Sequence, residues 1–537
     1  MSPVLPLTAD SAGNVAPLLD STGSDAAGSP LIGAGPSSLH DFLAALLDEQ
    51  QQLQTPVARF ASSQVQSGKP ALEPLYRDLI PLSKPQPGEQ YAFEVDLDSC
   101  SGCKACVTGC HSLNGLEENE TWRDVGVVLG TRSGQPFQQT ITSACHHCTD
   151  PACLNGCPVL AYEKDPVTGI VRHLDDQCMG CQYCVLKCPY DVPKYSERLG
   201  IVRKCDLCHG RLATGEAPAC VQACPTHAIR VVTVPVVKVG DRLTADTSHF
   251  LSTAPDPGIT SPTTRYVSAR PPPDLPVAGD CTPPPLQPAH LPLVAMLVLT
   301  QVGIGLLSSA VLFAGHSEHH TNAIASGLAC LVTGLAASIA HLGRPLRAWR
   351  VALNLRRSWL SREAVVFGMT LPLAFAYGAM KLFHQEERSA TVGGALLVLG
   401  GMGIVCSAMI YIDTRRRSWT VGQTTFRFAG TFLIAALAPI SAPAAAATLL
   451  LKLLGELALQ RTLRHDPLYG PAPVAPPPPG LRSLVRIRIA LGLVAAAGLS
   501  ANLTMIGMML FVAGEWYERR LFFQTSIPSK MPGVPRG

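Results

Sequence analysis

The sequence predicts an α+β domain built around cysteine-rich loops, followed by an all-α bundle of transmembrane helices. Three observations support this prediction. Sixteen of the nineteen cysteines fall between residues 100 and 224. They occupy two consecutive halves with similar spacing, which indicates an internal repeat. Beyond residue 290, loops rich in arginine alternate with apolar runs close to the ~20 residues that span a bilayer.

The sixteen cysteines form four groups of four with recurring spacing. They are Cys100, Cys103, Cys106 and Cys110; Cys145, Cys148, Cys153 and Cys157; Cys178, Cys181, Cys184 and Cys188; and Cys205, Cys208, Cys220 and Cys224. A proline follows the last cysteine of the second, third and fourth groups. Close thiolates followed by a Cys-Pro pair are typical of two-cluster ferredoxins, in which the fourth cysteine binds a different cluster. Sixteen ligands therefore predict four [4Fe–4S] clusters in a double ferredoxin-like domain.

Structural zinc and disulfide bonds are the alternative explanations for paired cysteines. Zinc sites need neither a third cysteine three residues on nor the Cys-Pro ending. Repeated pairs of cysteines with two residues between them do not suit disulfide geometry. Outside the four groups, Cys330 and Cys406 lie in apolar runs and are interpreted as small core residues, whereas Cys281 is interpreted as incidental.

Composition divides the chain into five predicted parts. These are an N-terminal extension over 1–89, a cluster domain over 90–239, a linker over 240–289, a membrane bundle over 290–523 and a tail over 524–537. Small and polar residues predict disorder over 1–37, and apolar spacing predicts a helix over 38–55. Strands are expected over 91–98 and 229–239, the second of which closes the cluster domain. Many prolines make the linker semi-rigid.

Seven apolar segments form the predicted membrane bundle, and an eighth span remains open. They cover roughly 291–314, 322–342, 364–383, 393–412, 426–441, 443–460 and 487–513. The last segment is long enough to tilt or to contain a break near Gly498. Lys452 and Glu456 share one face of the sixth segment. They are expected to form a local ion pair, with a proton-relay role as the alternative.

The distribution of basic residues favours a cytoplasmic cluster domain. With seven spans, the loops on the cluster side hold fifteen arginines, whereas the opposite side holds six lysines and arginines: Lys381, Arg388, Arg519, Arg520, Lys530 and Arg536. Positive residues mark the cytoplasmic side of membrane proteins. The N-terminal region has neither a basic segment nor an apolar one, so no cleavable export signal is expected. A net charge of +3 gives no indication of nucleic-acid binding.

A series of one-electron centres joined to a membrane bundle needs a lipid-soluble electron carrier, and a quinone is the natural one. Quinone chemistry also moves protons, so its site needs titratable groups near the membrane surface. His341 and Glu363 flank the arginine-rich loop after the second span and are the best candidates. The alternative is that both only cap helix ends, where their charges suit the helix dipoles. The histidines lie at span ends or in loops, so no haem is expected.

Two known subunits resemble this chain. Residues 90–232 resemble the four-cluster electron-transfer subunit of complex iron–sulfur molybdoenzymes such as dimethyl sulfoxide reductase, through CHHCTDPACLNGCP, CMGCQYCVLKCPYDVPKY and RKCDLCHGRLATGEAPACVQACP. Residues 290–523 resemble the membrane anchor subunit of the same enzymes, through HLGRPLRAWRVALNLRRSWLSRE and AGEWYERRLFF. The two are normally separate polypeptides, and here they are joined.

The resemblance implies ligands, substrate and partner. The first three cysteines of the first group would share a cluster with Cys224, those of the second with Cys188 and those of the third with Cys157, while those of the last would share one with Cys110. The family's anchors have eight spans and oxidise menaquinol beside a histidine and a glutamate that match His341 and Glu363. The catalytic molybdopterin subunit would be a separate chain. The implied location is the bacterial inner membrane.

The sequence thus predicts a multi-pass electron-transfer and anchor subunit. It would oxidise a quinol from the membrane pool and pass electrons through four clusters to a molybdopterin enzyme, such as a nitrate or dimethyl sulfoxide reductase. One alternative is an ion-coupled redox module that moves protons through Lys452 and Glu456. Charged residues nearly confined to one span disfavour that alternative. A redox sensor is disfavoured because no kinase, nucleotide-binding or DNA-binding module is visible.

Overall fold

The computed structural model describes residues 46, 59, 73–118, 120–239, 242–279, 287–313, 318–464, 479–526 and 529–533 of the chain. The segment predicted to be disordered over 1–37, Cys281 and all of the helix predicted over 38–55 except Leu46 lie outside the described residues. From Glu73 onward the chain forms one compact unit.

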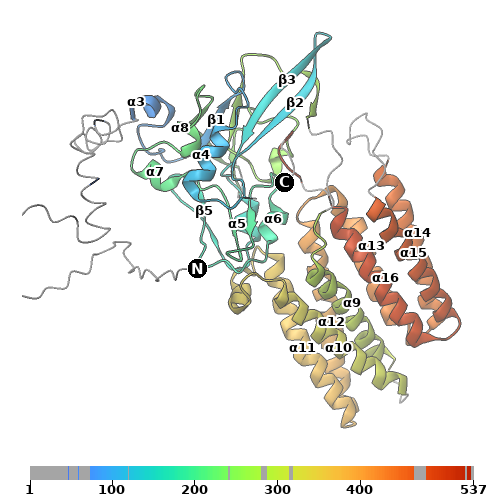
Figure 1. The fold of residues 1–537 in the computed structure, drawn as a ribbon. Helices are drawn as coiled ribbons and strands as arrows, with labels where there is room; N and C mark the ends of the chain where they lie inside the picture. The colour runs from blue at the N-terminus through green and yellow to red at the C-terminus, as the bar shows by residue number, and fades with distance from the viewer. Residues whose placement is uncertain are drawn as a thin grey trace, which may run out of the picture. The chain divides into compact units, whose positions relative to one another are not determined.

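Two small sheets frame the cysteine-rich loops (Figure 1). The first has the order β10-β1-β8-β9 and consists of β1 (Glu89–Asp96), β8 (Ile229–Val239), β9 (Arg242–Ala245) and β10 (Arg265–Val267). In it β1 pairs antiparallel to β8, with Phe93 opposite Val231, and parallel to β10. The second has the order β11-β2-β3 and consists of β2 (Asp124–Arg132), β3 (Gln135–Ser143) and β11 (Asp274–Ala278). The two predicted strands correspond to β1 and β8.

Five short helices lie among the cysteine-rich loops and carry five of the sixteen cysteines. They are α4 (Ala105–Asn114), α5 (Ala152–Gly156), α6 (Tyr183–Lys187), α7 (His209–Ala213) and α8 (Ala219–Gln222). Two small hairpins separate them, β4 (Tyr162–Lys164) with β5 (Val171–His173) and β6 (Lys194–Ser196) with β7 (Ile201–Arg203). Helix α4 packs against α8, and α5 packs against α6. The fold therefore pairs the first cysteine group with the fourth and the second with the third.

The segment expected to be a proline-rich linker belongs largely to the cluster domain. Strands β9, β10 and β11, with the short 3₁₀ helix η2 (Pro257–Ile259), lie between residues 242 and 278. The Thr149 and Asp150 N–H groups donate to the Ser261 and Thr260 carbonyls beside the second cysteine group. The linker prediction was wrong here because proline is compatible with edge strands and with irregular backbone that packs on a core.

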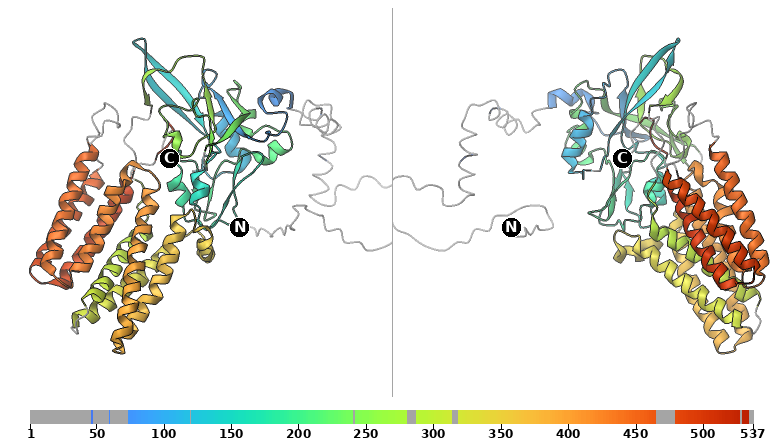
Figure 2. Two further views of the ribbon diagram at one scale, coloured as in Figure 1. Left: turned by 180° about the vertical axis from the view of Figure 1, so that it is seen from behind. Right: turned by 45° about the vertical axis from the view of Figure 1, so that its right-hand side comes forward.

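The cluster domain also extends beyond its predicted ends. Before β1, α3 (Glu73–Tyr76) and the 3₁₀ helix η1 (Arg77–Leu79) place Tyr76 and Leu79 in the same buried cluster as Phe93. In the C-terminal tail, Met531 is buried beside Val95. Figure 2 shows the β2–β3 hairpin extending from this domain. The boundaries of the cluster domain are therefore near residues 73 and 279, and the C-terminal tail adds Met531 to its core.

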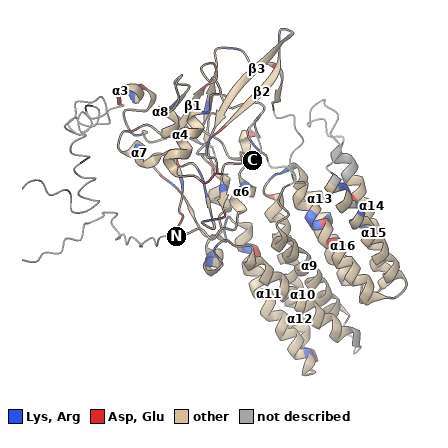
Figure 3. Cartoon of the chain, in the orientation of Figure 1, with Lys and Arg blue, Asp and Glu red and all other residues tan. Residues whose placement is uncertain are grey.

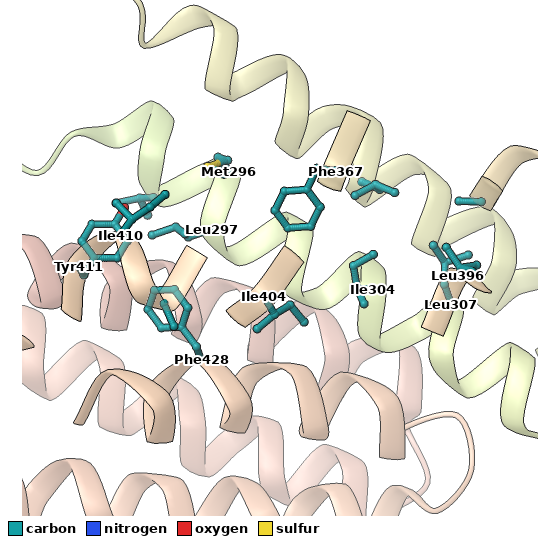
Figure 4. Close-up of a cluster of buried hydrophobic side chains, with 14 of the residues drawn as sticks. Met296, Leu297, Ile304, Leu307, Phe367, Leu396, Ile404, Ile410, Tyr411 and Phe428 are labelled. Atoms are coloured by element: carbon teal, nitrogen blue, oxygen red, sulfur yellow. The ribbon is translucent and has the colours of Figure 1, made fainter. Parts of the chain in front are cut away.

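Eight helices form the bundle within the described residues. They are α9 (Leu291–Leu312), α10 (Glu318–Ala340), α11 (Trp359–Leu382), α12 (Glu386–Ile412), α13 (Val421–Leu437), α14 (Ala442–Arg464), α15 (Pro479–Ser500) and α16 (Thr504–Gln524). Helix α9 is central and packs against α10, α12, α13 and α16. Figure 4 shows part of the apolar core around it, with Leu297 and Ile304 of α9 close to Phe367 and Tyr411.

The last predicted apolar segment is two antiparallel helices. Helix α15 ends at Ser500 and α16 begins at Thr504, with Asn502 in the left-handed conformation at φ 60°. Six of the described helices are long and apolar enough to cross a membrane; α13 is shorter, with 17 residues, and α16 carries charged residues. The turn reverses the chain, so the end of α16 lies on the cluster side, where Trp419 Nε1 donates to the Phe522 carbonyl. The prediction that Arg519, Arg520 and Lys530 face the opposite side was therefore wrong.

Candidate functional site

The four cysteine groups begin with the same backbone turn. The residue two positions after the first cysteine has a positive φ in every group: Gly102 (74°), His147 (41°), Gly180 (73°) and Leu207 (59°). The turn directs backbone N–H groups toward sulfur. The Gly180 N–H donates to Cys178 Sγ over 3.4 Å, and the Leu207 N–H donates to Cys205 Sγ over 3.5 Å. Non-glycine residues adopt this conformation rarely. Its recurrence indicates loops shaped to wrap a bound group.

Two Cys-Pro cysteines share a second contact. The N–H group of the residue four positions later donates to sulfur, from Ala161 to Cys157 Sγ over 3.2 Å and from Ala228 to Cys224 Sγ over 3.3 Å. Such bonds stabilise negative charge on a thiolate ligand and are one of the means by which proteins set cluster potentials. The fourth cysteine is therefore prepared as a ligand in the same way in both halves.

Two cavities are each lined by four cysteines. Three come from one group and the fourth from another, as the resemblance implies. Cys145, Cys148, Cys153 and Cys188 line one cavity, and Cys100, Cys103, Cys106 and Cys224 line the other. Thiols around a cavity fit a cubane, which takes a thiolate at each iron, better than zinc, whose ligands lie ~2.3 Å from one point. Among the described side chains, no three of His, Cys, Asp or Glu converge on a single metal ion.

The remaining cysteines are brought together in the same way. Burial, and then the neighbouring Cys157 thiolate, raise the pKa of Cys181 well above its usual value. Burial, and then the Cys220 thiolate, raise the pKa of Cys110 to about 12. These two thiols are therefore protonated at neutral pH when free of metal, and ligation of iron would release their protons.

Four sets of cysteines result, each numbered by the group that supplies three members. Set 1 is Cys100, Cys103, Cys106 and Cys224; set 2 is Cys145, Cys148, Cys153 and Cys188; set 3 is Cys178, Cys181, Cys184 and Cys157; set 4 is Cys205, Cys208, Cys220 and Cys110.

Buried side chains between the sets reveal their order. Tyr162 lies in the electrostatic field of thiols from sets 3 and 2. Lys204 lies between sets 2 and 4: its Nζ is 3.7 Å from Cys145 Sγ and donates to the Cys205 carbonyl over 2.8 Å. Arg123 is 1% exposed and interacts with thiols of sets 4 and 1. The order is therefore 3, 2, 4, 1.

Set 3 is held directly against the bundle. Asn354 Nδ2 donates to the Cys157 carbonyl over 2.8 Å, and Arg347 Nη1 donates to the Cys178 carbonyl over 3.2 Å. Both residues belong to the 3₁₀ helix η3 (Pro345–Asn354) between α10 and α11. Gly343 allows this contact, because a Cβ there would lie 2.3 Å from the Gly200 carbonyl oxygen. The arginine-rich loop therefore docks the cluster domain.

His341 lies between the bundle and set 3. Its ring lies near the Cys181 backbone and makes an edge contact with His290, whose ring centre is 5.6 Å away. Burial, and then the nearby His290, lower the pKa of His341 to about 4, so the imidazole is neutral at pH 7. His290 precedes α9, far from His341 in sequence, and only the fold brings the two rings together.

Glu363 approaches the same cysteine set from α11. The carboxyl group is 3% exposed and accepts a hydrogen bond from the Ser407 hydroxyl of α12. Tyr183, adjacent to Cys184, lies in the electrostatic field of Glu363 and donates to the Ile410 carbonyl over 3.3 Å. His341 and Glu363 therefore both adjoin set 3, one through Cys181 and the other through Tyr183. Sequence reasoning missed Tyr183 and Ser407, which carry no motif of their own.

The charged residues of the bundle are not confined to one helix. Lys452 Nζ is 3.9 Å from Glu456, as the local ion pair predicts, but it also bonds Glu515 of α16. Arg488 of α15 bonds both Glu456 and Glu515. The prediction of charges nearly confined to one span was wrong because the last apolar segment is two helices, and α16 brings its acidic residues back into the bundle.

Comparisons with known proteins match both halves of the chain. Residues 137–234 match the 4Fe-4S dicluster domain, and residues 288–459 match the DMSO reductase anchor subunit (DmsC). These matches agree with the cysteine-lined cavities and with the apolar helices. The chain is accordingly an iron–sulfur, electron-transfer protein with a membrane anchor.

Relatives of the cluster domain include the B subunit of anaerobic dimethyl sulfoxide reductase from Haemophilus influenzae, 36% identical over 150 residues, which are 26% of this chain and 73% of the relative. The B subunit from Escherichia coli K12 is 36% identical over 148 residues, 26% of this chain and 72% of the relative. The hydrogenase-2 operon protein HybA of Escherichia coli O157:H7 is 38% identical over 160 residues, 25% of this chain and 49% of the relative. The protein therefore belongs to the family of dimethyl sulfoxide reductase iron–sulfur B subunits, with an anchor-subunit domain of the same type joined to it.

Proposed function

We propose that this chain oxidises a quinol, expected to be menaquinol, beside His341 and Glu363 and delivers the electrons to a separate molybdopterin catalytic subunit. The observation that carries the proposal is the proximity of the His341 ring to the Cys181 backbone. It supports a quinol site next to set 3, which the bundle holds through η3. Relatives named as B subunits of anaerobic dimethyl sulfoxide reductase support a partner of that enzyme class.

Each cysteine set is proposed to hold one [4Fe–4S] cluster. When bound, such clusters supply one-electron transfer over a wide range of potentials. The protein determines the route, because the order of sets 3, 2, 4 and 1 leads away from the bundle. At its far end Cys103 is exposed. We therefore expect the catalytic subunit to dock over set 1. The absence of haem stays a prediction.

The two site residues have separate roles in this proposal. Neutral His341 carries one ring N–H that faces the Cys181 backbone in this proposal, and its other ring nitrogen accepts a hydrogen bond from a quinol hydroxyl. Glu363 offers a buried carboxyl group that can take up a proton. A quinol bound between these residues could give its electrons to the cluster of set 3 and a proton to Glu363. Quinol oxidation requires both transfers.

A cytoplasmic cluster domain remains our proposal for the sidedness. The turn at Asn502 moves Arg519, Arg520 and Lys530 to the cluster side, which strengthens the positive bias there. Arg344 and Arg347 weaken it, because their contacts show that they dock the cluster domain. A cytoplasm-facing molybdoenzyme, such as a nitrate reductase, would fit this orientation.

The cluster content provides the first test. We expect about sixteen iron atoms per purified chain, four for each of four cubanes. Reduction by menaquinol of the protein in nanodiscs should bleach the visible iron–sulfur absorbance without any partner. A count stable near twelve would contradict one ligand set, and absorbance that dithionite bleaches but menaquinol does not would contradict the quinol site.

Lys204 should raise the potentials of the clusters in sets 2 and 4. A reduced cluster carries one more negative charge than an oxidised one, and a buried cation stabilises that charge. Lys204→Met is therefore expected to lower both midpoint potentials, measured by redox titration with paramagnetic resonance. Lys238→Met, which removes an exposed lysine from β8, is the matched control and should leave them unchanged. Equal potentials in wild type and Lys204→Met would contradict this role.

A further inference from the structure

A buried ionic network joins α13, α14, α15 and α16. Its charged members are Arg427, Lys452, Glu456, Arg488, Glu515, Glu518 and Arg519. Their side chains are at most 11% exposed. Figure 3 shows basic and acidic segments side by side on α13 and α16 in an otherwise nearly uncharged bundle. Charges in a membrane bundle are costly and usually functional.

The Thr431 hydroxyl is the centre of this network. It donates to Glu515 Oε2 over 2.6 Å and accepts from Lys452 Nζ over 2.8 Å. Arg519 Nη2 approaches the same oxygen at 3.2 Å and also donates to Gln301 Oε1 over 2.9 Å. The hydroxyl therefore links Lys452, Glu515 and Arg519 in one set of hydrogen bonds.

The network contains one more cation than carboxylate. Four basic residues face three acidic ones, so full ionisation would bury a net charge of +1. Arginine stays protonated in proteins, whereas lysine readily loses its proton when buried. Lys452 is thus the one cation of the network that can restore neutrality. The Nη1 of Arg488 and the Nε of Arg519 are buried without a hydrogen-bond partner in the described structure, which leaves donors for water.

The network reaches only one side of the bundle. Lys452 lies near the middle of α14, and Arg427 lies near the start of α13, on the cluster side. Toward the opposite side, an apolar cluster that includes Ala445, Leu499 and Phe511 packs between the same four helices. A proton could therefore enter or leave through the cluster side, whereas the side chains of this apolar cluster cannot carry one.

Tyr411 lies near both this network and the proposed quinol site. It lies in the electrostatic fields of both Glu363 and Arg519. The Arg519 guanidinium also lies over the Phe428 ring, 4.4 Å from its centre, and Phe428 contacts Tyr411 with ring centres 5.9 Å apart. The aromatic group thus packs the network against the residues around Glu363.

We propose that the network is a proton acceptor for quinol oxidation and that the Lys452 amine is the group that binds the proton. The inference rests on the proposed quinol function. Oxidation of a quinol to a quinone releases two electrons to the clusters and two protons. One proton passes from Glu363 to the network, where it converts the neutral Lys452 amine to an ammonium, and then leaves on the cluster side. The other departs on the His341 side.

Lys452→Arg tests this proposal because it keeps a cation but cannot release its proton. In nanodiscs, we expect menaquinol-driven cluster reduction to slow about a hundredfold, the lower end of what a positioned proton-transfer group contributes. Reduction by dithionite, which needs no proton acceptor in the bundle, should be unchanged. Proton release reported by a pH dye should slow in parallel with cluster reduction.

The controls separate this inference from the quinol function itself. Lys381→Arg makes the same substitution in an ion pair with Glu386 at the opposite end of the bundle and should leave the rate unchanged. Glu515→Gln removes a network carboxylate by an independent change and should also slow the reaction. If menaquinol fails to reduce the wild-type clusters, the quinol function is contradicted. If it reduces wild type and both network variants equally fast, the proton-acceptor role is contradicted.

Discussion

His341→Ala is expected to slow menaquinol-driven reduction of the clusters by about a hundredfold or more, because it removes the acceptor for a quinol hydroxyl. Dithionite should still reduce all clusters, since their ligands are untouched. Stopped-flow measurement of the iron–sulfur absorbance in nanodiscs gives both rates. The pH dependence follows from the pKa of His341 near 4: the imidazole is neutral from pH 8 to pH 5, so its titration should reduce the rate only as the pH falls toward 4.

His249→Ala is the matched control, because it removes an exposed imidazole from the cluster domain. Its rate should equal that of wild type. Glu363→Gln keeps the shape of the side chain and its contact with Ser407 but cannot take up a proton, so it should be as slow as His341→Ala. Unchanged menaquinol rates in both site variants would remove the assignment and favour helix capping as the role of these residues.

Cys181→Ala is expected to disconnect the remaining clusters from the quinol. Set 3 is the only set that the described contacts hold against both η3 and His341. Loss of its cluster should lower the iron content to about twelve atoms, three cubanes of four. The remaining clusters should accept electrons from dithionite but only negligibly from menaquinol. Iron analysis and paramagnetic resonance of the same preparation distinguish this result from general loss of clusters.

Cys330→Ala provides the corresponding control. Cys330 lies on α10 outside the four groups and packs partly buried against the bundle. Iron content and menaquinol reactivity should stay at their wild-type values. Rapid menaquinol reduction of a Cys181→Ala protein with twelve iron atoms would contradict the order of sets proposed here, because electrons would then enter beyond set 3.

The cysteine spacing alone was enough to predict the iron–sulfur domain. Cysteines that are close in sequence and bind one cluster must lie on a tight loop. Their spacing in the sequence is therefore enough to indicate the type of cluster that they bind. The repeated left-handed turns at Gly102, His147, Gly180 and Leu207 are consistent with that expectation. The apolar runs predicted the bundle for a similar reason, since the length of a span is a property of a single segment.

Contacts between distant segments were harder to predict. The strands β9, β10 and β11 were concealed in a proline-rich segment, because pairing with β1, β2 and β8 rather than local propensity forms them. The turn between α15 and α16 falls within one apolar run, where the sequence left a tilted span and a break near Gly498 both open, and packing of the two helices against each other decides between them. Because the segment was interpreted as a single span, Arg519, Arg520 and Lys530 were assigned to the wrong side of the membrane. The charged residues of α16 were also not recognised as part of the bundle.

The sequence by itself determined which residues could bind iron–sulfur clusters and where the chain could enter a membrane. It also showed that His341 and Glu363 lie at the two ends of the arginine-rich loop. These are local properties of composition and spacing. Only the tertiary structure decided that both residues adjoin set 3, that Lys204 lies between two sets, and that charges from four helices meet around Thr431. Burial and electrostatic interaction depend on distance in space, and the fold alone sets the distances between residues far apart in the chain.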